Sequence, residues 1–352
     1  TGAPSLTVQS GTFETQTCTG AAGASEIRCD FGEVSNNSQI LIEIPVRVDN
    51  WPSGGTITNT ASVTVDDRQT FDPVGGNNSN TGTVDILRSS LSGYVYEDVN
   101  FNDERDGSEP GISGVSIRLT GTDDFGNVVD ETTTTNGSGL FEFTDLSPST
   151  SGLGGGYRLV QTQPSGYLDG REQVGSVGGV IVSPDPDAAI PDEIENIFLP
   201  ADTNATDYNF AELREGSLAG WVFIDSNGNG TRNSGETSGL PNLDVRLVGT
   251  DYTGAAVDLS VQTTANGRYE FNNLVPGDYR IVQEGILEGL LPTGPQVGTI
   301  AGNTSGTAVP AALPTPPEVQ DIALISNGTG NNYNFGWVGQ DISGFVAPHG
   351  FK

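Results

Sequence analysis

Apolar and polar residues alternate in short segments along most of the chain. Val115, Ile117 and Leu119 are apolar at every second position, and residues 40–48 and 56–65 are rich in β-branched and apolar residues. A period of two marks a half-buried β-strand, whereas an amphipathic helix needs a period near 3.6. Gly, Asn, Asp and Pro interrupt these segments at short intervals, as turns between strands require. The pattern predicts an all-β protein without long helices.

The chain also contains an internal repeat. Leu91-Ser-Gly-Tyr-Val-Tyr matches Leu218-Ala-Gly-Trp-Val-Phe, and the similarity continues until both copies close on Tyr-Asn-Phe, at 208–210 and 333–335. A repeat locates domain boundaries better than local propensity does, because each copy is one structural unit. Each copy has alternating segments for about seven strands, which predicts a sandwich of two packed sheets.

The repeat divides the chain into four parts. They are an Ig-like β domain at 1–88, which is small for a complete domain, sandwich repeats at 89–214 and 215–339, and an orphan strand or tail at 340–352. We expect the orphan strand because Asp341-Ile-Ser-Gly-Phe-Val repeats the opening strand of both sandwiches. Strand addition to an open sheet edge can join molecules head to tail. Complementary chain ends are therefore one hypothesis, and a fragment of a longer repeat protein is the other.

Two segments between late strands, at 172–202 and 296–320, are rich in Gly, Pro, Ala and acidic residues. Long segments of this composition usually run over the surface, so we expect surface excursions there. An adhesin binding module that recognises a glycan or a host protein through these excursions is the alternative functional hypothesis. The excursions contain almost no aromatic residues, which counts against it.

A twelve-residue acidic loop follows the opening strand of each repeat. Its residues at positions 1, 3, 5, 7, 9 and 12 are Asp98, Asn100, Asn102, Glu104, Asp106 and Glu109 in the first copy, and Asp225, Asn227, Asn229, Thr231, Asn233 and Glu236 in the second. Short Asp and Asn side chains at this spacing, a backbone carbonyl at position 7 and a final bidentate Glu form the calcium loop of EF-hand proteins. We therefore predict one calcium ion in each loop.

Two other interpretations of the loops stay open, namely solvated Asp and Asn turns and part of a catalytic acid pair. Turn chemistry alone rarely places Glu at position 12 in two copies. A helical EF-hand is excluded, because Gly93-Tyr-Val-Tyr and Gly220-Trp-Val-Phe alternate like strands where they enter the loops. The first loop has more carboxylates, whereas the second has Gly230 at the sharp turn where the first has Asp103. Charge favours the first site and geometry the second.

A second repeated turn follows the first internal strand of each copy. Its sequence is Gly-Thr-Asp, and it places Asp123 and Asp251 at equivalent positions. Both are candidates for an additional metal ion, and the alternative is an Asx turn, in which the side chain accepts hydrogen bonds from nearby backbone.

Charge limits the possible partners. The chain has 45 acidic and 14 basic residues and a net charge of −31. Nucleic acids and anionic membrane surfaces are therefore poor partners, whereas divalent cations are good ones. No apolar run approaches the roughly 20 residues that span a bilayer, so we expect no membrane insertion in this segment. His349 has no recognisable nucleophile partner, and we expect no enzyme activity.

The two cysteines are Cys18 and Cys29, in a chain without Met. A local disulfide that closes a hairpin is the preferred interpretation, because the other features indicate an extracellular protein. Two buried thiols are the alternative.

The motifs resemble those of the calcium-binding B repeats of Sdr-type bacterial surface adhesins, within the Cna B-type, transthyretin-like sandwich class. The resemblance rests on the opening strand, the acidic loop, Gly121-Thr-Asp and Pro164-Ser-Gly-Tyr-Leu-Asp-Gly. The second copy departs from it with Glu288-Gly-Leu-Leu-Pro-Thr-Gly. Residues 1–88 are similar to part of an Ig-like repeat domain of large bacterial surface proteins.

The resemblance implies extracellular stalk modules that calcium stiffens. Many B-type domains carry a Lys–Asn isopeptide cross-link, but the single lysine here is Lys352, so an internal cross-link in either repeat is excluded. Calcium binding is then expected to be the main local interaction that stabilises each repeat. We expect an extracellular, secreted or cell-surface structural protein, such as a stalk, a fibre or a surface-layer segment, whose partners are calcium ions and copies of itself or adjoining domains.

Overall fold

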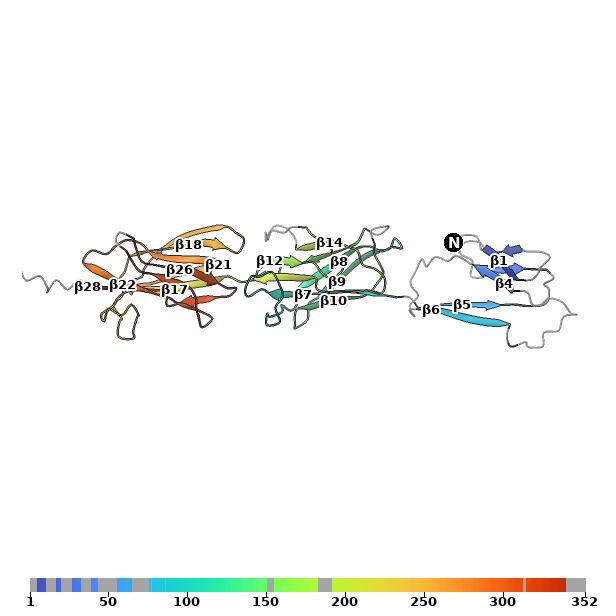
Figure 1. Ribbon diagram of the computed structural model, residues 1–352, viewed down its shortest axis with the longest axis horizontal. Helices are drawn as coiled ribbons and strands as arrows, with labels where there is room; N and C mark the ends of the chain where they lie inside the picture. Colours follow the sequence, from blue (N-terminus) through green and yellow to red (C-terminus); the bar gives the residue numbers. More distant parts are fainter. Residues whose placement is uncertain are drawn as a thin grey trace, which may run out of the picture. The chain divides into compact units, whose positions relative to one another are not determined.

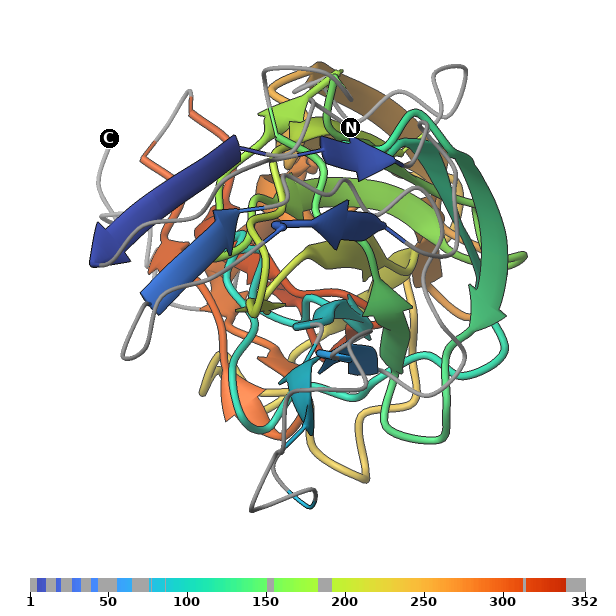
Figure 2. The ribbon, with the colours of Figure 1, turned by 90° about the vertical axis from the view of Figure 1, so that its right-hand side faces the viewer.

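The computed structural model describes residues 5–10, 17–19, 27–32, 39–43, 56–64, 76, 78–85, 87–150, 155–182, 192–312 and 315–339. These residues form strands and connecting loops and contain no helix (Figures 1 and 2). The chain divides into two compact units, Thr1–Leu87 and Arg88–Lys352. The all-β prediction is confirmed. The predicted orphan strand and Lys352 lie outside the described residues.

The described residues of the first unit form three antiparallel strand pairs. They are β1 (Ser5–Ser10) with β4 (Gln39–Glu43), β2 (Thr17–Thr19) with β3 (Arg28–Asp30), and β5 (Thr56–Ser62) with β6 (Ser79–Asp85). Cys18 lies directly opposite Cys29 in the β2–β3 register. Opposite residues in an antiparallel pair have Cα atoms about 4.5–5.5 Å apart, a separation that a disulfide can bridge. The backbone thus allows the disulfide, which stays a prediction.

The first repeat of the second unit is a sandwich of two sheets. One has the order β10 (Leu140–Leu146), β7 (Ser89–Glu97), β16 (Asn209–Leu213), β12 (Leu168–Gln173), and β15 (Asn204–Ala205) also pairs with β7. The other has the order β13 (Val180–Ile181), β14 (Glu193–Ile197), β11 (Tyr157–Gln161), β8 (Ser116–Thr122), β9 (Val128–Thr134). Alternate residues of the two sheets, such as Val95, Ile117, Leu119 and Phe141, are buried together in one core.

The second repeat has the same plan. Its first sheet has the order β22 (Leu290–Gln296), β28 (Asn334–Gly339), β17 (Gly216–Ile224), β27 (Thr329–Asn331), β23 (Thr299–Ile300), β24 (Asn303–Thr304), and β20 (Arg268–Leu274) also pairs with β17. Its second sheet has the order β19 (Ala256–Gln262), β18 (Asp244–Asp251), β21 (Gly277–Gln283), β26 (Glu318–Leu324), β25 (Thr307–Val309). Trp337 and Phe335 of β28 lie in its core.

The opening strand holds a central position in each repeat. β7 pairs antiparallel with β10 on one side and parallel with β16 on the other. β17 makes the equivalent pairs with β20 and β28. A loop that leaves the end of such a strand starts from a backbone that is held on both sides.

The prediction of surface excursions at 172–202 and 296–320 is wrong where these segments form paired strands, and residues 183–191 and 313–314 lie outside the described residues. The first segment contains β13 and β14, and the second contains β23 to β25 and the start of β26. Ile194, Ile197 and Leu199 are fully buried in the core of the first repeat. Short strands between Gly- and Pro-rich turns have too few residues to show a period, so alternation in the sequence does not reveal them. Each repeat consequently has more than the expected seven strands among its described residues.

Hydrogen bonds join the two repeats within the second unit. The Glu97 carboxylate, which is 3% exposed, accepts a hydrogen bond from the Ser326 hydroxyl at 2.8 Å and one from Arg214 Nε at 3.0 Å. The Ser326 backbone N–H donates to the Val99 carbonyl at 3.2 Å, and the Asn327 N–H donates to the Arg214 carbonyl at 3.1 Å. Since Val99 is position 2 of the first acidic loop, this loop is bonded directly to the second repeat.

Candidate metal centre

The two acidic loops begin where β7 and β17 leave their sheets. The Asp98 side chain is 1% exposed and the Asp225 side chain is fully buried. The Asp98 N–H donates to the Glu212 carbonyl and the Asp225 N–H donates to the Trp337 carbonyl, both at 2.9 Å. Position 1 of each loop is therefore fixed by the last strand of its repeat.

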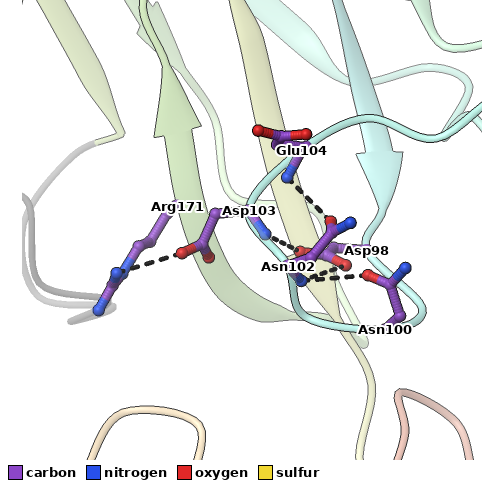
Figure 3. Close-up of polar contacts among 6 residues, drawn as sticks. All are labelled: Asp98, Asn100, Asn102, Asp103, Glu104 and Arg171. Atoms are coloured by element: carbon purple, nitrogen blue, oxygen red, sulfur yellow. Dashed lines mark hydrogen bonds and ion pairs between the residues drawn. The ribbon is translucent and has the colours of Figure 1, made fainter.

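In the first loop, the side-chain oxygens of the early positions face the loop's own backbone (Figure 3). Asp98 Oδ1 and Asn100 Oδ1 both accept a hydrogen bond from the Asn102 N–H, at 3.3 and 3.1 Å, and Asp98 Oδ2 accepts one from the Asp103 N–H at 2.9 Å. The amides of Asn100 and Asn102 donate to Asp106 Oδ2, at 2.9 and 3.2 Å. The side chains at positions 1, 3, 5 and 9 thus converge.

In the second loop the same positions make an equivalent network. Asp225 Oδ1 accepts hydrogen bonds from the N–H groups of Gly228 and Asn229, at 2.8 and 3.3 Å, and its Oδ2 accepts one from Gly230 at 2.7 Å. Asn227 Oδ1 accepts one from the Asn229 N–H at 3.0 Å. Asn233 Nδ2 reaches Asn229 Oδ1 at 3.3 Å. The two loops therefore share one conformation despite different sequences.

The Glu at position 12 closes each loop. Glu109 Oε1 accepts a hydrogen bond from the Val99 N–H and its Oε2 accepts one from the Asp106 N–H, both at 2.9 Å. Glu236 does the same with Ser226 and Asn233, at 2.9 and 2.8 Å. Both Glu side chains are buried. Each carboxylate thus has both oxygens directed into its loop, which is the orientation a bidentate calcium ligand needs.

At position 7 the loop holds the backbone of the residue and not its side chain. The Glu104 and Thr231 side chains are exposed, and the Glu104 carboxylate points away from Asn102 in Figure 3. Glu104 N–H donates to Asn102 Oδ1 at 3.0 Å, and Thr231 N–H donates to Asn229 Oδ1 at 2.9 Å. The backbone is thereby pinned at position 7, where an EF-hand-type loop uses the carbonyl oxygen.

The sharp turn at position 6 has a positive φ in both loops, 62° at Asp103 and 74° at Gly230. Glycine adopts this conformation without strain, and Asp tolerates it better than most residues. The Asp103 carboxylate turns away from the other loop oxygens and forms an ion pair with Arg171 of β12 at 3.2 Å (Figure 3). Asp103 is therefore a turn residue that anchors the loop to a neighbouring strand.

An arginine at position 8 anchors each loop, and the sequence analysis missed it. The Arg105 guanidinium lies 3.7 Å from the centre of the Tyr94 ring, and that of Arg232 lies 4.6 Å from the centre of the Trp221 ring. Both rings belong to the opening strand, and a cation over an aromatic face is attractive. The sequence could have revealed this contact, because both copies have Arg at position 8 of the loop and an aromatic residue at the same position of the opening strand.

The charge environment differs between the loops. Burial raises the pKa of Asp98 to about 6, and the negative charge of Glu109 acts in the same direction. Burial also acts to raise the pKa of Asp225, but the nearby Thr293 side chain and hydrogen bonds from three backbone N–H groups outweigh it, so the pKa of Asp225 lies below its usual value. Buried carboxylates among amide and carbonyl oxygens suit a hard cation such as calcium, so the donor set of both loops fits the predicted ion.

Asp123 and Asp251 close the β8–β9 and β18–β19 turns. Asp123 Oδ1 accepts hydrogen bonds from the N–H groups of Phe125 and Asn127, at 2.9 and 2.8 Å. Asp251 Oδ1 accepts equivalent bonds from Thr253 and Ala255, both at 3.0 Å. These are Asx-turn contacts, so the alternative interpretation accounts for their arrangement, and an additional ion at either position stays a prediction.

A separate group of acids was not singled out from the sequence. Asp169 and Glu172 of β12 and Asp192, which precedes β14, have ligand oxygens within 4.8 Å of one another. The signal that could have revealed them is the contrast between the copies, because the equivalent segments of the second repeat lack these carboxylates.

Comparisons with known proteins agree with this architecture. The model of the SdrD B-like domain family matches residues 89–210 and 216–311. Serine-aspartate repeat-containing protein C of Staphylococcus aureus strain Newman is 30% identical over 260 residues, which are 72% of this chain and 25% of that protein. The same protein of strain N315 is 31% identical over 208 residues, 59% of this chain and 20% of that protein. The chain thus spans about a quarter of the length of these relatives.

Two solved structures also align with the chain. A shaft pilin SpaA from Lactobacillus rhamnosus GG, a double mutant, is 10% identical and covers 73% of this chain and 99% of its own, with a TM-score of 0.25. The Bacillus anthracis TIE protein is 13% identical and covers 74% of this chain and 36% of its own, with the same TM-score of 0.25. The resemblance to Sdr-type B repeats is confirmed by the family match, which includes both repeats. The chain belongs to the SdrD B-like domain family.

Proposed function

We propose that this chain is an extracellular structural segment of a bacterial surface protein, in which calcium stiffens two tandem sandwich repeats. The observation that supports this most strongly is the pair of twelve-residue loops. Each begins with a buried Asp at the end of a central strand and closes with a buried Glu that has both oxygens directed inward. A structural role at the cell surface is supported by the family and by relatives of which this chain spans about a quarter.

Calcium would stabilise the folded state because the loops arrange their oxygens only when the strands are paired. A ligand that binds only the folded state adds about 2.7 kcal/mol at a concentration 100 times its Kd. It would also offset the repulsion among acids in a chain of net charge −31. The described residues of both repeats contain no lysine, so a Lys–Asn cross-link does not stabilise either sandwich.

A passive structural role is also the simplest account of the remaining features. In the part of the chain that the structure describes, no helix is long and apolar enough to cross a membrane. We infer that the partners are calcium, adjoining domains of a larger protein and further copies of the chain. Parts of the segments expected to serve as recognition loops, such as β14 and β23, are paired strands with buried apolar residues instead, which counts against the adhesin binding module. Head-to-tail strand exchange stays a prediction, because 340–352 lies outside the described residues.

Removal of calcium tests the proposal directly. Thermal unfolding of the full chain, followed by circular dichroism, is measured in calcium, in magnesium and with a chelator. We expect the chelator to lower Tm by roughly 5–10 °C, because about 2–4 °C is lost per kcal/mol in a domain of this size. Magnesium serves as the control for simple screening of negative charge. Identical melting curves in all three conditions would refute calcium stiffening.

A further inference from the structure

We propose that Asn136 is a site of spontaneous deamidation, at which the backbone nitrogen of Gly137 and a water molecule convert the side-chain amide to a carboxylate. The two residues lie in the turn between β9 and β10 of the first repeat, and both are exposed. The reaction needs water as its co-reactant and no cofactor. It goes beyond the structural role proposed above and does not depend on calcium.

The reaction has two stages. A base in the solvent removes the proton of the Gly137 N–H, and the nitrogen attacks Asn136 Cγ. A bond forms between these atoms, and the Cγ–Nδ2 bond breaks as Nδ2 takes a proton from water and leaves as ammonia. Water then adds to one of the two carbonyl carbons of the cyclic imide and breaks its bond to the nitrogen, which regains a proton. The product is aspartate or isoaspartate, and attack within adjacent residues needs no approach of distant groups.

The backbone N–H of Gly137 is available for this attack. The chain contains five Asn-Gly pairs, at 136–137, 227–228, 229–230, 266–267 and 327–328. Gly228 and Gly230 donate their N–H to the Asp225 carboxylate, at 2.8 and 2.7 Å. Gly267 and Gly328 donate to backbone carbonyls, at 2.8 and 2.9 Å. Among the described residues, the Gly137 N–H has no acceptor. Deprotonation breaks any hydrogen bond that an N–H donates, so a bonded nitrogen is the less available nucleophile.

The side-chain carbonyl of Asn136 is surrounded by donors. Its Oδ1 accepts hydrogen bonds from the Ser138 N–H at 2.9 Å, from the Ser138 hydroxyl at 2.8 Å and from the Leu140 N–H at 3.1 Å. Negative charge develops on Oδ1 when the nitrogen adds to Cγ. Donors that already contact this oxygen stabilise the charge, as in an oxyanion hole. The turn thus provides both a free nucleophile and a polarised carbonyl.

The second repeat lacks the reactive pair at this position. The Thr135 hydroxyl donates to the Ile112 carbonyl as the Thr263 hydroxyl donates to the Leu240 carbonyl, both at 2.7 Å. This equivalence places Thr264 and Ala265 where the first repeat has Asn136 and Gly137. A threonine side chain has no carbonyl carbon that a nitrogen could attack. The turn is therefore reactive in the first repeat alone.

The isoaspartate product does not fit the turn. The Gly139 N–H donates to the Asn136 carbonyl at 3.0 Å. In isoaspartate the main chain runs through the former side chain, and this carbonyl becomes part of a free carboxylate. The surrounding backbone leaves no space for the longer chain, since even a Cβ on Gly139 would lie 2.3 Å from the Val95 carbonyl oxygen. We expect the aged chain to have a lower Tm than the fresh chain.

Ageing of the full chain tests the proposal. The chain is incubated at mildly alkaline pH in water labelled with heavy oxygen, and mass spectrometry of proteolytic peptides follows the label at all five Asn-Gly pairs. We expect Asn136 to react several times faster than each of the other four asparagines in the folded chain. In denaturant the rates should become similar, because glycine follows all of them. If Asn136 reacts no faster than the others in the folded chain, the proposal is wrong.

Two variants examine the turn itself. Gly137→Ala adds a methyl group that meets nothing within 4 Å, so the fold is kept while the attacking nitrogen is crowded, and deamidation should slow several-fold. Ser138→Ala removes the hydroxyl donor to Oδ1 and should slow the reaction in the folded chain but not in denaturant. Circular dichroism confirms that each variant is folded. A faster reaction in Ser138→Ala would mean that the bonds to Oδ1 protect the amide, and this would overturn the inference.

Discussion

Glu236 and Glu109 show how much of each loop depends on single carboxylates. Each accepts hydrogen bonds from two backbone N–H groups at opposite ends of its loop, and each is buried. A carboxylate has two acceptor oxygens, whereas an amide has one acceptor and one donor. Replacement of Glu by Gln therefore keeps the size of the side chain and sets an NH₂ group against a backbone N–H.

We predict that Glu236→Gln weakens calcium binding at the second loop by roughly tenfold or more, which corresponds to at least about 1.4 kcal/mol. It should also destabilise the calcium-free chain by about 1–3 kcal/mol, because the Asn233 N–H loses its acceptor. Calorimetric calcium titration and chemical denaturation measure the two effects. Ser234→Ala, at an exposed position of the same loop, is the control. Equal affinity in the two variants would remove Glu236 from the ligand set.

The arginine at position 8 also supports each loop, although position 8 does not belong to the ligand spacing. Arg105 and Arg232 lie over Tyr94 and Trp221. Stacking of this kind holds the loop against its own strand before any ion binds. Under the proposed function, calcium would meet a loop that is largely formed already, so less of its binding free energy would be lost in ordering the chain.

At the scale of elements, the opening strand tolerates only glycine at one position. A Cβ atom on Gly93 would lie 1.7 Å from the Tyr208 carbonyl oxygen, and one on Gly220 would lie 1.8 Å from that of Tyr333. The strand and the segment before β16 or β28 therefore approach more closely than any side chain allows. The repeated Gly of the opening strand thus has a packing reason in both copies.

Gly93→Ala should destabilise the first repeat by roughly 1–3 kcal/mol, the usual cost of an overpacked core. The added methyl must push β7 away from Tyr208, and this also displaces the start of the first acidic loop. Gly137→Ala is the matched control, since a Cβ there meets nothing within 4 Å. Urea denaturation compares the two variants with the wild type. If both substitutions lower the free energy of unfolding by the same amount, the close approach to Tyr208 is not the reason for glycine at position 93.

At the scale of the whole second unit, the first loop and the junction between repeats share residues. Glu97 precedes the loop and holds Arg214 and Ser326, while Val99 within the loop accepts the Ser326 N–H. Glu97 is 3% exposed, so its charge is poorly hydrated and depends on these partners. Order in the loop and order at the junction are therefore expected to change together.

We expect Glu97→Gln to loosen the junction without unfolding either sandwich. Loss of the ion pair with the partly exposed Arg214 should cost about 1–2 kcal/mol, less than a fully buried pair. Hydrogen exchange at the Ser326 and Asn327 amides, which donate across the junction, should become several times faster. Asp130→Asn, which breaks the exposed pair with Arg118, is the control. Unchanged exchange at both amides would show that Glu97 does not hold the repeats together.

Local properties of the chain were sufficient for much of this description. Alternation, the internal repeat and the spacing of Asp98 to Glu109 and of Asp225 to Glu236 are all properties of short segments, so the sequence by itself determined the strand-rich class, the two copies and the placement of the loops. The loop positions could be predicted because twelve consecutive residues contain the entire proposed ligand set.

Only the tertiary structure decided which distant segments meet. Pairing of β12 with β16 and of β11 with β14 brings Asp169, Asp192, Glu212 and Gln161 together, and no local pattern encodes these registers. Ile194 and Ile197 were assigned to a surface excursion because a five-residue strand is too short to show its period, yet both are fully buried. Long-range pairing depends on the free energy of the whole sandwich, and this is why it cannot be obtained from residue spacing alone.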